Sequence, residues 1–266
     1  MKIAIITGAS SGLGREFALQ IDALKEVDEI WLVARRRDRL EEVGALLKTT
    51  ARVICADLSV REGVIAVQQA LEARAPHIKY LVNAAGFGKI GSYRDIPLDE
   101  IDRMIDLNCK GAVDVTQICL PYCSRGSKIL EICSTAAFQP FQYLNVYAAS
   151  KAFLYRYSRA LNTELMAEGI DVTAVCPYWI KDTEFISVAE EGQRDAGTPS
   201  YIHGFPFAQT SQEVVCRALG DAKIGLSVST PGLVCTVHRF AAKILSANIM
   251  MALWEHIRKM GSGSRD

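Results

Sequence analysis

The sequence lacks an excess of charge of either sign, since its 266 residues include 30 basic and 30 acidic side chains. This balance gives no reason to expect a nucleic-acid partner or an anionic membrane surface. The eight cysteines include no CxxC pair, which argues against a zinc site or a disulfide framework. Several of them lie in apolar runs, and we interpret these as buried free thiols in a reducing cytoplasm.

Long apolar runs are missing as well. The late stretch 231–254 is the most apolar, but it contains a histidine and two basic residues and therefore falls short of a membrane span. The chain begins with Met1 and continues directly into an expected strand, so we expect no signal peptide and a cytoplasmic protein. The glycine- and serine-rich tail 261–266 is expected to be flexible.

Short β-branched runs alternate with amphipathic segments along the whole chain. The runs predict strands and the amphipathic segments predict helices. Strands separated by helices indicate parallel βαβ crossovers, and hence an α/β fold with a doubly wound parallel sheet of about seven strands and helices on both faces. The expected strands are 2–7, 28–34, 51–56, 79–83, 127–133, 170–176 and 224–228, and the expected helices are 13–25, 37–48, 61–74, 97–123 and 146–168.

Two details of this pattern bear on the site. In the last expected helix, Ala149, Phe153, Tyr157 and Leu161 recur at every fourth position, which places them on one helical face. The region 178–210 is irregular and rich in proline and glycine. Long loops of this kind in a compact domain tend to be lids, so we expect a substrate lid there.

The stretch TGASSGLG, residues 7–14, follows the first expected strand. Gly8 permits a tight turn, Gly12 and Gly14 allow a phosphate to approach the backbone, and the helix that begins near Leu13 presents unpaired N–H groups to an anion. The spacing differs from the commoner G-x-G-x-x-G pattern, and glycine-rich turns also occur as plain structure. By itself, the loop favours neither interpretation, a nucleotide-binding site or a purely structural turn.

The residues after the second expected strand favour a particular nucleotide. An acidic residue there binds ribose hydroxyls, whereas an arginine accommodates a 2′-phosphate. Here Arg35, Arg36 and Arg37 follow the strand, and the first acid is Asp38. Basic residues at a helix N-terminus oppose the helix dipole, so the cluster favours an anionic ligand over a solvated helix start. Because a guanidinium suits a phosphate, NADP(H) is favoured over NAD(H).

Further motifs follow in order: Asn83-Ala84-Ala85-Gly86, Asn108, Ser134, and Tyr147 four residues before Lys151. With the glycine loop, they resemble the classical short-chain dehydrogenase/reductase family over essentially the whole chain. The resemblance implies one Rossmann-type NADP(H)-binding domain over 1–260. It implies that Asn108, Ser134, Tyr147 and Lys151 are catalytic, and that Asn108 holds a water in a proton relay through Lys151. No metal is implied.

The same resemblance implies a set of cofactor-binding residues. The chain departs from the family pattern at two positions. Tyr178 replaces the usual glycine after the proline that follows the sixth strand, and Ala137 replaces a usual glycine after the catalytic serine. Thr183 matches the threonine that binds the nicotinamide carboxamide in many members of the family, but it comes one residue later in this chain. The expected cofactor-binding residues are Gly8, Ser10, Ser11, Gly12, Leu13, Gly14, Arg35, Arg36, Asp57, Leu58, Asn83, Ala84, Gly86, Tyr147, Lys151, Pro177, Ile180 and Thr183.

Physical chemistry supports the catalytic assignment. Tyr147 and Lys151 share one helical face. A phenol with a pKa of about 10 is a poor base at neutral pH, and an ammonium together with an oxidised nicotinamide would lower that pKa. An isolated YxxxK is more often a structural tyrosine with a surface lysine. Ser134 decides against that interpretation, because it ends a strand where open α/β sheets bind ligands and can hold a substrate oxygen.

Aromatic residues surround the expected substrate pocket and predict a bulky apolar alcohol or ketone. A hydroxysteroid or bile acid is our first hypothesis, and another lipid-like or acyl ketone is the alternative. A nucleotide-sensing protein without catalysis is the competing class, against which the intact catalytic set argues. The expected wall comprises Phe87, Phe138, Phe141, Tyr143, Tyr178, Trp179, Phe205 and Phe207.

The segment 233–258 is long and amphipathic. It could cover the pocket, pack in a subunit interface, or rest against a membrane or lipid substrate, and the sequence leaves these three roles open. We expect the protein to form a homodimer or homotetramer.

Overall fold

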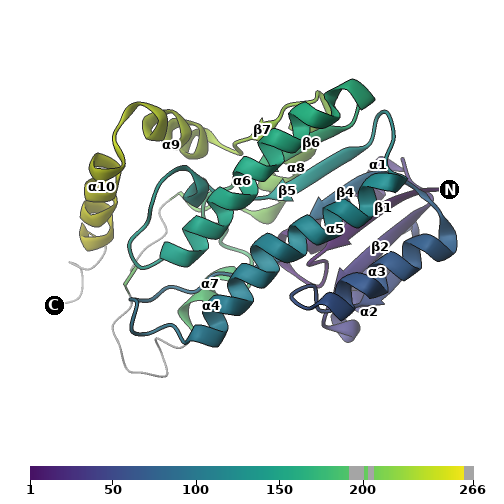
Figure 1. Cartoon of the computed structure of the whole chain (residues 1–266), viewed down its shortest axis with the longest axis horizontal. Helices are drawn as coiled ribbons and strands as arrows, with labels where there is room; N and C mark the ends of the chain where they lie inside the picture. Colours follow the sequence, from purple (N-terminus) through teal and green to yellow (C-terminus); the bar gives the residue numbers. More distant parts are fainter. Residues whose placement is uncertain (192–200, 203–206, 261–266) are drawn as a thin grey trace.

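Seven strands form one parallel sheet in the order β3-β2-β1-β4-β5-β6-β7. A computed structural model describes residues 1–191, 201–202 and 207–260 of the chain (Figure 1). The expected doubly wound sheet is confirmed, although the last strand is only two residues long. The strands are β1 (Lys2–Thr7), β2 (Glu29–Ala34), β3 (Thr50–Cys55), β4 (His77–Asn83), β5 (Lys128–Ile132), β6 (Asp171–Val175) and β7 (Val228–Ser229).

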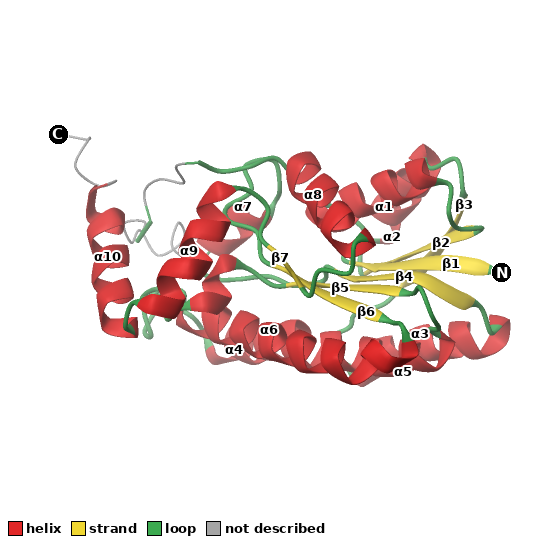
Figure 2. Ribbon diagram, turned by 90° about the horizontal axis from the view of Figure 1, so that it is seen from above, coloured by secondary structure: helices red, strands yellow, loops and turns green. Residues whose placement is uncertain are grey.

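Helices cover both faces of the sheet, as Figure 2 shows. On one face lie α1 (Gly12–Leu24), α2 (Arg37–Leu46) and α8 (Ser211–Lys223), the last of which the sequence pattern did not predict. On the other lie α3 (Arg61–Arg74), α4 (Leu98–Ile105), α5 (Ala112–Cys119) and α6 (Asn145–Leu165).

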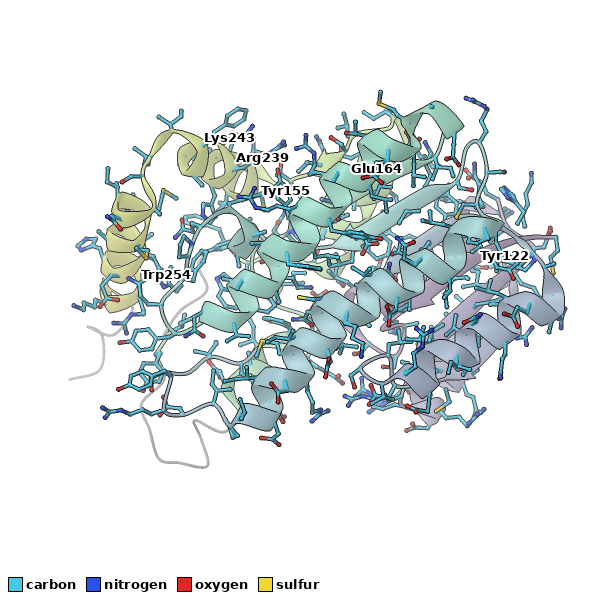
Figure 3. All side chains as sticks on the ribbon, in the orientation of Figure 1. Tyr122, Tyr155, Glu164, Arg239, Lys243 and Trp254 are labelled. Atoms are coloured by element: carbon cyan, nitrogen blue, oxygen red, sulfur yellow. The ribbon has the colours of Figure 1, made fainter. Side chains whose placement is uncertain are left out.

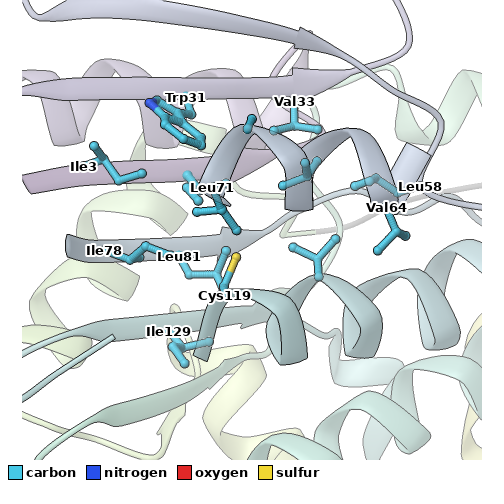
Figure 4. Close-up of a cluster of buried hydrophobic side chains, with 14 of the residues drawn as sticks. Ile3, Trp31, Val33, Leu58, Val64, Leu71, Ile78, Leu81, Cys119 and Ile129 are labelled. Atoms are coloured by element: carbon cyan, nitrogen blue, oxygen red, sulfur yellow. The ribbon is translucent and has the colours of Figure 1, made fainter. Parts of the chain in front are cut away.

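The central strand shows why the strands are apolar throughout. Ile3 and Ile5 pack with Trp31 and Leu71 in the core toward α3 and α5 (Figure 4), whereas the alternate residues of β1 join a second core toward α1. Because both faces of β1 are covered, its interior residues are all fully buried and no polar alternation remains.

The helix expected over 97–123 is interrupted. A π-helical turn, Asp106–Gly111, joins α4 to α5, and a short 3₁₀ turn follows. Gly111 allows this region to approach the loop after β3, because a Cβ at that position would lie 2.4 Å from the Leu58 carbonyl oxygen. Single π-helical turns are rare and frequently occur at functional sites, and this one carries Asn108.

The buried face of α6 is not the face that the sequence pattern predicted from residues 149, 153, 157 and 161. Ala149 and Phe153 are exposed, and only Leu161 of that series is fully buried. Four helical residues turn the chain through one full rotation plus about 40°, so such a series drifts around the helix and cannot mark a single face over three turns. The buried face instead begins with Tyr147 and Lys151.

The amphipathic segment expected at 233–258 forms two helices, α9 (Leu233–Ile244) and α10 (Ala247–Met260), at one end of the molecule (Figure 1). Within the described residues, no helix has the length and apolar character that crossing a membrane requires. Of the expected lid, the short helix α7 (Phe185–Glu190) is described. Residues 192–200 and 203–206 of that lid, and the tail 261–266, lie outside the described residues.

Candidate active site

The carboxyl ends of the strands border one pocket, which collects residues from the whole length of the sheet. All the expected catalytic and cofactor-binding residues line it except Asn83 and Asn108. Ser10, Ser11, Arg35, Arg36 and Glu184 form what we term the anion end. The aromatic end comprises Phe141, Tyr147, Trp179 and Phe185. Arg36 follows β2 and Ser134 follows β5, three strands away in the sheet order, which corresponds to about 14 Å.

Steric contact explains the glycine loop. Gly8 has a φ of +65°, and a Cβ there would lie 2.8 Å from the backbone of Ala84. A Cβ on Gly14 would lie 2.3 Å from the Gly8 carbonyl oxygen. Ser11, at the N-cap of α1, makes no side-chain capping bond. The first turn of α1 therefore keeps N–H groups that an anion in the pocket can accept from.

Arg36 already binds an anion in this structure. Its guanidinium donates to both carboxylate oxygens of Glu184, at 2.8 and 3.3 Å, and to the hydroxyls of Ser11 at 2.9 Å and Ser10 at 3.3 Å. The hydrogen bond from Arg36 lowers the pKa of the Glu184 carboxyl. A planar guanidinium that binds a carboxylate in this way also suits a phosphate.

Arg35 and Asp57 lie beside this group. The Arg35 guanidinium is 3.8 Å from the Asp57 carboxylate, and Asp57 also accepts from the amide and hydroxyl of Ser59. Burial opposes ionisation of Asp57, but the hydrogen bonds of Ser59 and the charge of Arg35 outweigh it and lower the pKa of the carboxyl. Asp57 is therefore a charged acceptor at the rim of the pocket.

Three of the expected catalytic residues meet at the aromatic end. Tyr147 and Lys151 lie one turn apart on α6, with the Lys151 ammonium nitrogen 5.8 Å from the centre of the Tyr147 ring. Ser134 caps a short 3₁₀ turn two residues after β5, where its Oγ accepts from the Ala136 amide at 3.1 Å and hydrogen-bonds to Tyr147. A hydroxyl, a phenol and an ammonium thus converge on one point of the pocket.

Burial controls the charge of this group. It raises the pKa of the Tyr147 phenol, and the hydrogen bond with Ser134 offsets this only in part. Burial also lowers the pKa of the Lys151 ammonium. Burial therefore outweighs any lowering of the phenol pKa by Lys151, whose Nζ donates to the Ile132 carbonyl at 2.7 Å. Tyr147 is consequently a neutral phenol at neutral pH.

Asn108 lies below the pocket and is fully buried. Its amide donates to the Phe87 carbonyl at 2.8 Å and to Ser150 at 3.1 Å, while its oxygen accepts from the Phe87 amide at 3.0 Å. Gly86 separates Asn108 from Lys151, since a Cβ on Gly86 would lie 2.9 Å from Asn108 Oδ1 and 3.3 Å from Lys151 Nζ. Asn108 therefore holds the backbone of Phe87 and lies close to Lys151.

Asn83 points away from the pocket into the core. Its amide donates to Thr116 at 2.8 Å and to the Glu131 carboxylate at 2.9 Å. Glu131 is fully buried on β5, and its second carboxylate oxygen has no hydrogen-bond partner among the described residues. Burial raises the pKa of Glu131 to about 7. Asn83 thus connects β4 to β5 and α5 from below the site.

Four of the eight expected wall aromatics line the pocket, namely Phe87, Phe141, Tyr178 and Trp179. Three others lie elsewhere: Phe138 packs edge-on against Tyr155, Tyr143 stacks on Tyr201, and Phe207 is largely exposed. The last, Phe205, lies outside the described residues.

Sequence reasoning missed Glu184 and Phe185, which line the pocket. The Phe185 ring lies 5.3 Å from the Tyr147 ring, and Trp254 of α10 (labelled in Figure 3) packs 4.9 Å from Phe141 and donates to the Gln142 carbonyl. The acid at Glu184, next to the expected Thr183, was an available signal because it has the sign opposite to the arginines. Trp254 lies in the amphipathic segment 233–258, for which covering the pocket was one of the three roles that the sequence left open.

The family model for short chain dehydrogenases matches residues 2–194. The chain is 35% identical over 208 residues to sulfoacetaldehyde reductase 2 of Chromohalobacter salexigens, covering 75% of this chain and 80% of that protein. It is 30% identical over 254 residues to the very-long-chain 3-oxoacyl-CoA reductase of Anas platyrhynchos, covering 91% and 74%. A solved short-chain dehydrogenase from Sphingobium yanoikuyae in complex with NADPH has a TM-score of 0.75 and 27% identity, covering 100% of this chain and 97% of that one.

The chain therefore belongs to the short-chain dehydrogenase family, as its motifs indicated. It is an oxidoreductase of that family. The two relatives act, by their names, on very different substrates. Membership of the family thus leaves the substrate open.

Proposed function

We propose that this oxidoreductase interconverts a secondary alcohol and a ketone with NADP(H) as its cofactor. One observation carries the proposal: a single pocket has Ser134, Tyr147 and Lys151 at one end and the Arg36 anion site at the other. A nucleotide sensor without catalysis would need only the glycine loop and the anion site. It has no use for a hydroxyl, a buried phenol and a buried ammonium that meet at one point.

The catalytic roles follow from the geometry. When bound, a nicotinamide cofactor supplies or accepts the hydride. Ser134 donates a hydrogen bond to the substrate oxygen and holds it next to the Tyr147 hydroxyl. Because Tyr147 is a neutral phenol, it can donate its proton to that oxygen during ketone reduction and recover it from an alcohol in the reverse direction. Lys151 lies near enough to stabilise the phenolate that this transfer leaves.

Asn108 and Lys151 support these steps. In our proposal, Lys151 also binds the nicotinamide ribose, and Asn108 holds a water that returns a proton through Lys151. A Cβ on Gly86 would lie 2.9 Å from Asn108 Oδ1 and 3.3 Å from Lys151 Nζ, so both atoms lie close to the same point. This proximity supports the relay. The hydrogen bonds of Asn108 to Phe87 at the same time keep the Asn108 amide in a fixed orientation.

The anion end favours NADP(H) over NAD(H). The Glu184 carboxylate accepts hydrogen bonds from the Arg36 guanidinium, and it occupies the place where we expect the 2′-phosphate. Replacing one anion by another preserves every charge-assisted hydrogen bond of the guanidinium. A cofactor that lacks the 2′-phosphate would leave Arg36 bound to Glu184 and would gain nothing from it.

The aromatic end favours a bulky apolar substrate. Phe87, Phe141, Trp179 and Phe185 present apolar rings next to Tyr147, and each methylene that such a wall buries contributes about 0.8 kcal/mol. We propose a hydroxysteroid or bile acid first and another lipid-like or acyl ketone second. We also propose that the protein forms a homodimer or homotetramer, which sedimentation velocity tests.

Tyr147→Phe tests the reaction. A screen of hydroxysteroids, bile acids, acyl ketones and simple sugars, followed by the absorbance of NADPH, first identifies a substrate. On it, Tyr147→Phe should lose at least about a hundredfold in kcat, the usual contribution of a positioned acid, while NADPH affinity stays unchanged. The matched control is Tyr155→Phe on the same helix, whose ring packs on Phe138 and does not line the pocket. Near-wild-type turnover of Tyr147→Phe would refute the assignment.

A further inference from the structure

The two C-terminal helices expose a large apolar surface. On α9, the exposed fractions of Leu233, Val237, Phe240 and Ile244 are 78%, 56%, 59% and 80%. Their spacing of three or four residues places all four on one face of the helix. On α10, Ile249, Leu253 and Ile257 are each about half exposed and repeat at every fourth position. Apolar residues grouped in this way on a surface mark an interaction site.

The opposite faces attach both helices to the body of the protein. Cys235 of α9 is fully buried, and His238 of α9 hydrogen-bonds to Gln139 at 2.8 Å. Met250 and Trp254 of α10 are buried, and Trp254 packs on Phe141 at the aromatic end. Each helix is thus apolar on two sides. The body of the protein covers one of these sides, and the other is exposed. We call the two exposed rows the outer stripes of α9 and α10.

Charge is unevenly distributed on these helices, although the whole chain is balanced. Between residues 233 and 260 there are four basic residues and a single acid, Glu255. Arg258 and Lys259 both bind the Glu255 carboxylate, at 2.6 and 3.2 Å. Lys243 is exposed beside the outer stripe of α9 and makes no ion pair with any described residue (Figure 3). The partner of this surface should therefore be apolar and carry negative charge.

These charges argue against a second copy of the chain as the partner. A two-fold contact through the same surface would bring the cations of one copy against those of the other. The only acid of the two helices is already paired, so no carboxylate there would be available to neutralise them. An anionic lipid bilayer provides both an acyl boundary for the apolar stripes and phosphates for the exposed lysine side chains.

We propose that the outer stripes of α9 and α10 rest on the surface of an anionic lipid bilayer. Phe240 and its neighbours on α9, with Leu253 on α10, enter the boundary between headgroups and acyl chains, and Lys243 contacts headgroup phosphates. Because Trp254 joins the inner side of α10 to Phe141, the same contact places the aromatic end of the pocket near the membrane. An apolar substrate could then enter the pocket from the bilayer. This access rests on the proposed function, whereas the lipid binding does not.

Cosedimentation of the full-length protein with vesicles tests the proposal. Vesicles of phosphatidylcholine alone are compared with vesicles that also contain phosphatidylglycerol, at low and high salt. We expect binding to the anionic vesicles, weaker binding to the neutral ones, and a loss of binding as salt screens the lysine and arginine charges. Equal or absent binding to both kinds of vesicle overturns the proposal.

Variants locate the contact. Phe240→Ser and Leu253→Ser should each weaken binding about tenfold, which is the lower range for one large apolar side chain withdrawn from water. Lys243→Glu should weaken binding to anionic vesicles by about fivefold or more, since one lysine contributes about 1 kcal/mol there. Phe153→Ser is the matched control, because Phe153 is equally exposed but lies on α6.

Three further measurements separate the alternatives. If sedimentation velocity shows an assembly that Phe240→Ser dissociates, while no vesicle binding occurs, the stripes form an interface between copies and the membrane proposal is wrong. Thermal unfolding of Phe240→Ser should match that of the wild type, since the side chain is largely exposed. Tyr147→Phe should bind vesicles as the wild type does, so failure of the proposed reaction and failure of lipid binding are distinguishable.

Discussion

The anion end and the aromatic end of the pocket are built in different ways. At the anion end, backbone packs on backbone: Gly8 lies against Ala84, and Gly14 lies against Gly8, in each case with no room for a Cβ. At the aromatic end, side chain packs on side chain, as where Trp254 contacts Phe141. The first kind of contact accepts only glycine, whereas the second accepts many combinations of similar volume.

This difference determines how each end can vary. A backbone contact cannot relax by choosing another rotamer, so the loop that would bind the cofactor is tied to one short sequence pattern. Side-chain contacts can be exchanged in compensating pairs, so the aromatic end can adapt to different substrates on an unchanged framework. The two relatives named above, with their very different substrates, are consistent with that division.

Among the substitutions that test this comparison, Gly14→Ala should have the largest effect, which is a decrease in the free energy of unfolding. Its methyl group would lie 2.3 Å from the Gly8 carbonyl oxygen, and overpacking of this kind costs about 3 kcal/mol or more when backbone must move. The matched control is Gly220→Ala within α8, where nothing lies within 4 Å of the added Cβ. That change should stabilise the protein by up to about 1 kcal/mol. Urea unfolding measures both, and equal stabilities of the two variants would contradict the backbone argument.

Glu131, which is fully buried on β5, should make stability depend on pH. Its folded pKa is raised to about 7 by burial, whereas an exposed glutamate titrates at about 4.3. Between these values the folded state holds a proton that the unfolded state has lost, so the free energy of unfolding falls as pH rises from about 5 to 8. The decrease is on the order of 3 kcal/mol.

Glu131→Gln removes this titration. Urea unfolding at a series of pH values should therefore show a much flatter profile for the variant than for the wild type. A variant profile with the same slope as that of the wild type over this interval would mean that Glu131 stays ionised in the folded protein.

Arg36→Ala tests the anion end directly. A charge-assisted hydrogen bond contributes roughly 1.5–3 kcal/mol, so the variant should bind NADPH about ten- to a hundredfold more weakly and NADH almost as before. Arg37→Ala is the control, because Arg37 lies next in the chain but pairs with Glu41 and does not line the pocket. Calorimetric titration with both cofactors measures the difference, and equal wild-type affinities for NADPH and NADH would contradict the role of Arg36.

Glu184→Gln should have the smallest effect, and it should have the opposite sign. Without the carboxylate, Arg36 no longer has to leave one anion to bind another. Exposed ion pairs contribute about 0.2–1 kcal/mol, so NADPH affinity should rise by up to about fivefold. Glu191→Gln, which removes a partner of Lys89 nearby, is the control. Weaker NADPH binding by Glu184→Gln would show that the carboxylate assists the cofactor and does not compete with it.

The sequence by itself determined the parallel sheet, the glycine loop and the grouping of Ser134, Tyr147 and Lys151. These features depend on local pattern: apolar strands covered on both faces, steric exclusion of Cβ at a turn, and the four-residue turn of a helix. The sheet then carries such residues to one edge, because the carboxyl ends of parallel strands all lie there. The resemblance to the family placed Asn83 in the cofactor site, although its amide faces Thr116 and Glu131.

Only the tertiary structure decided the contacts between distant segments. Glu184 binds Arg36 across 148 positions of the chain, and Trp254 reaches Phe141 across more than a hundred. The tertiary structure likewise divided the C-terminal segment into two helices with one side buried and one exposed. No local pattern encodes these results, because a side chain's partner depends on how whole helices and strands pack, and that packing is a property of the entire chain.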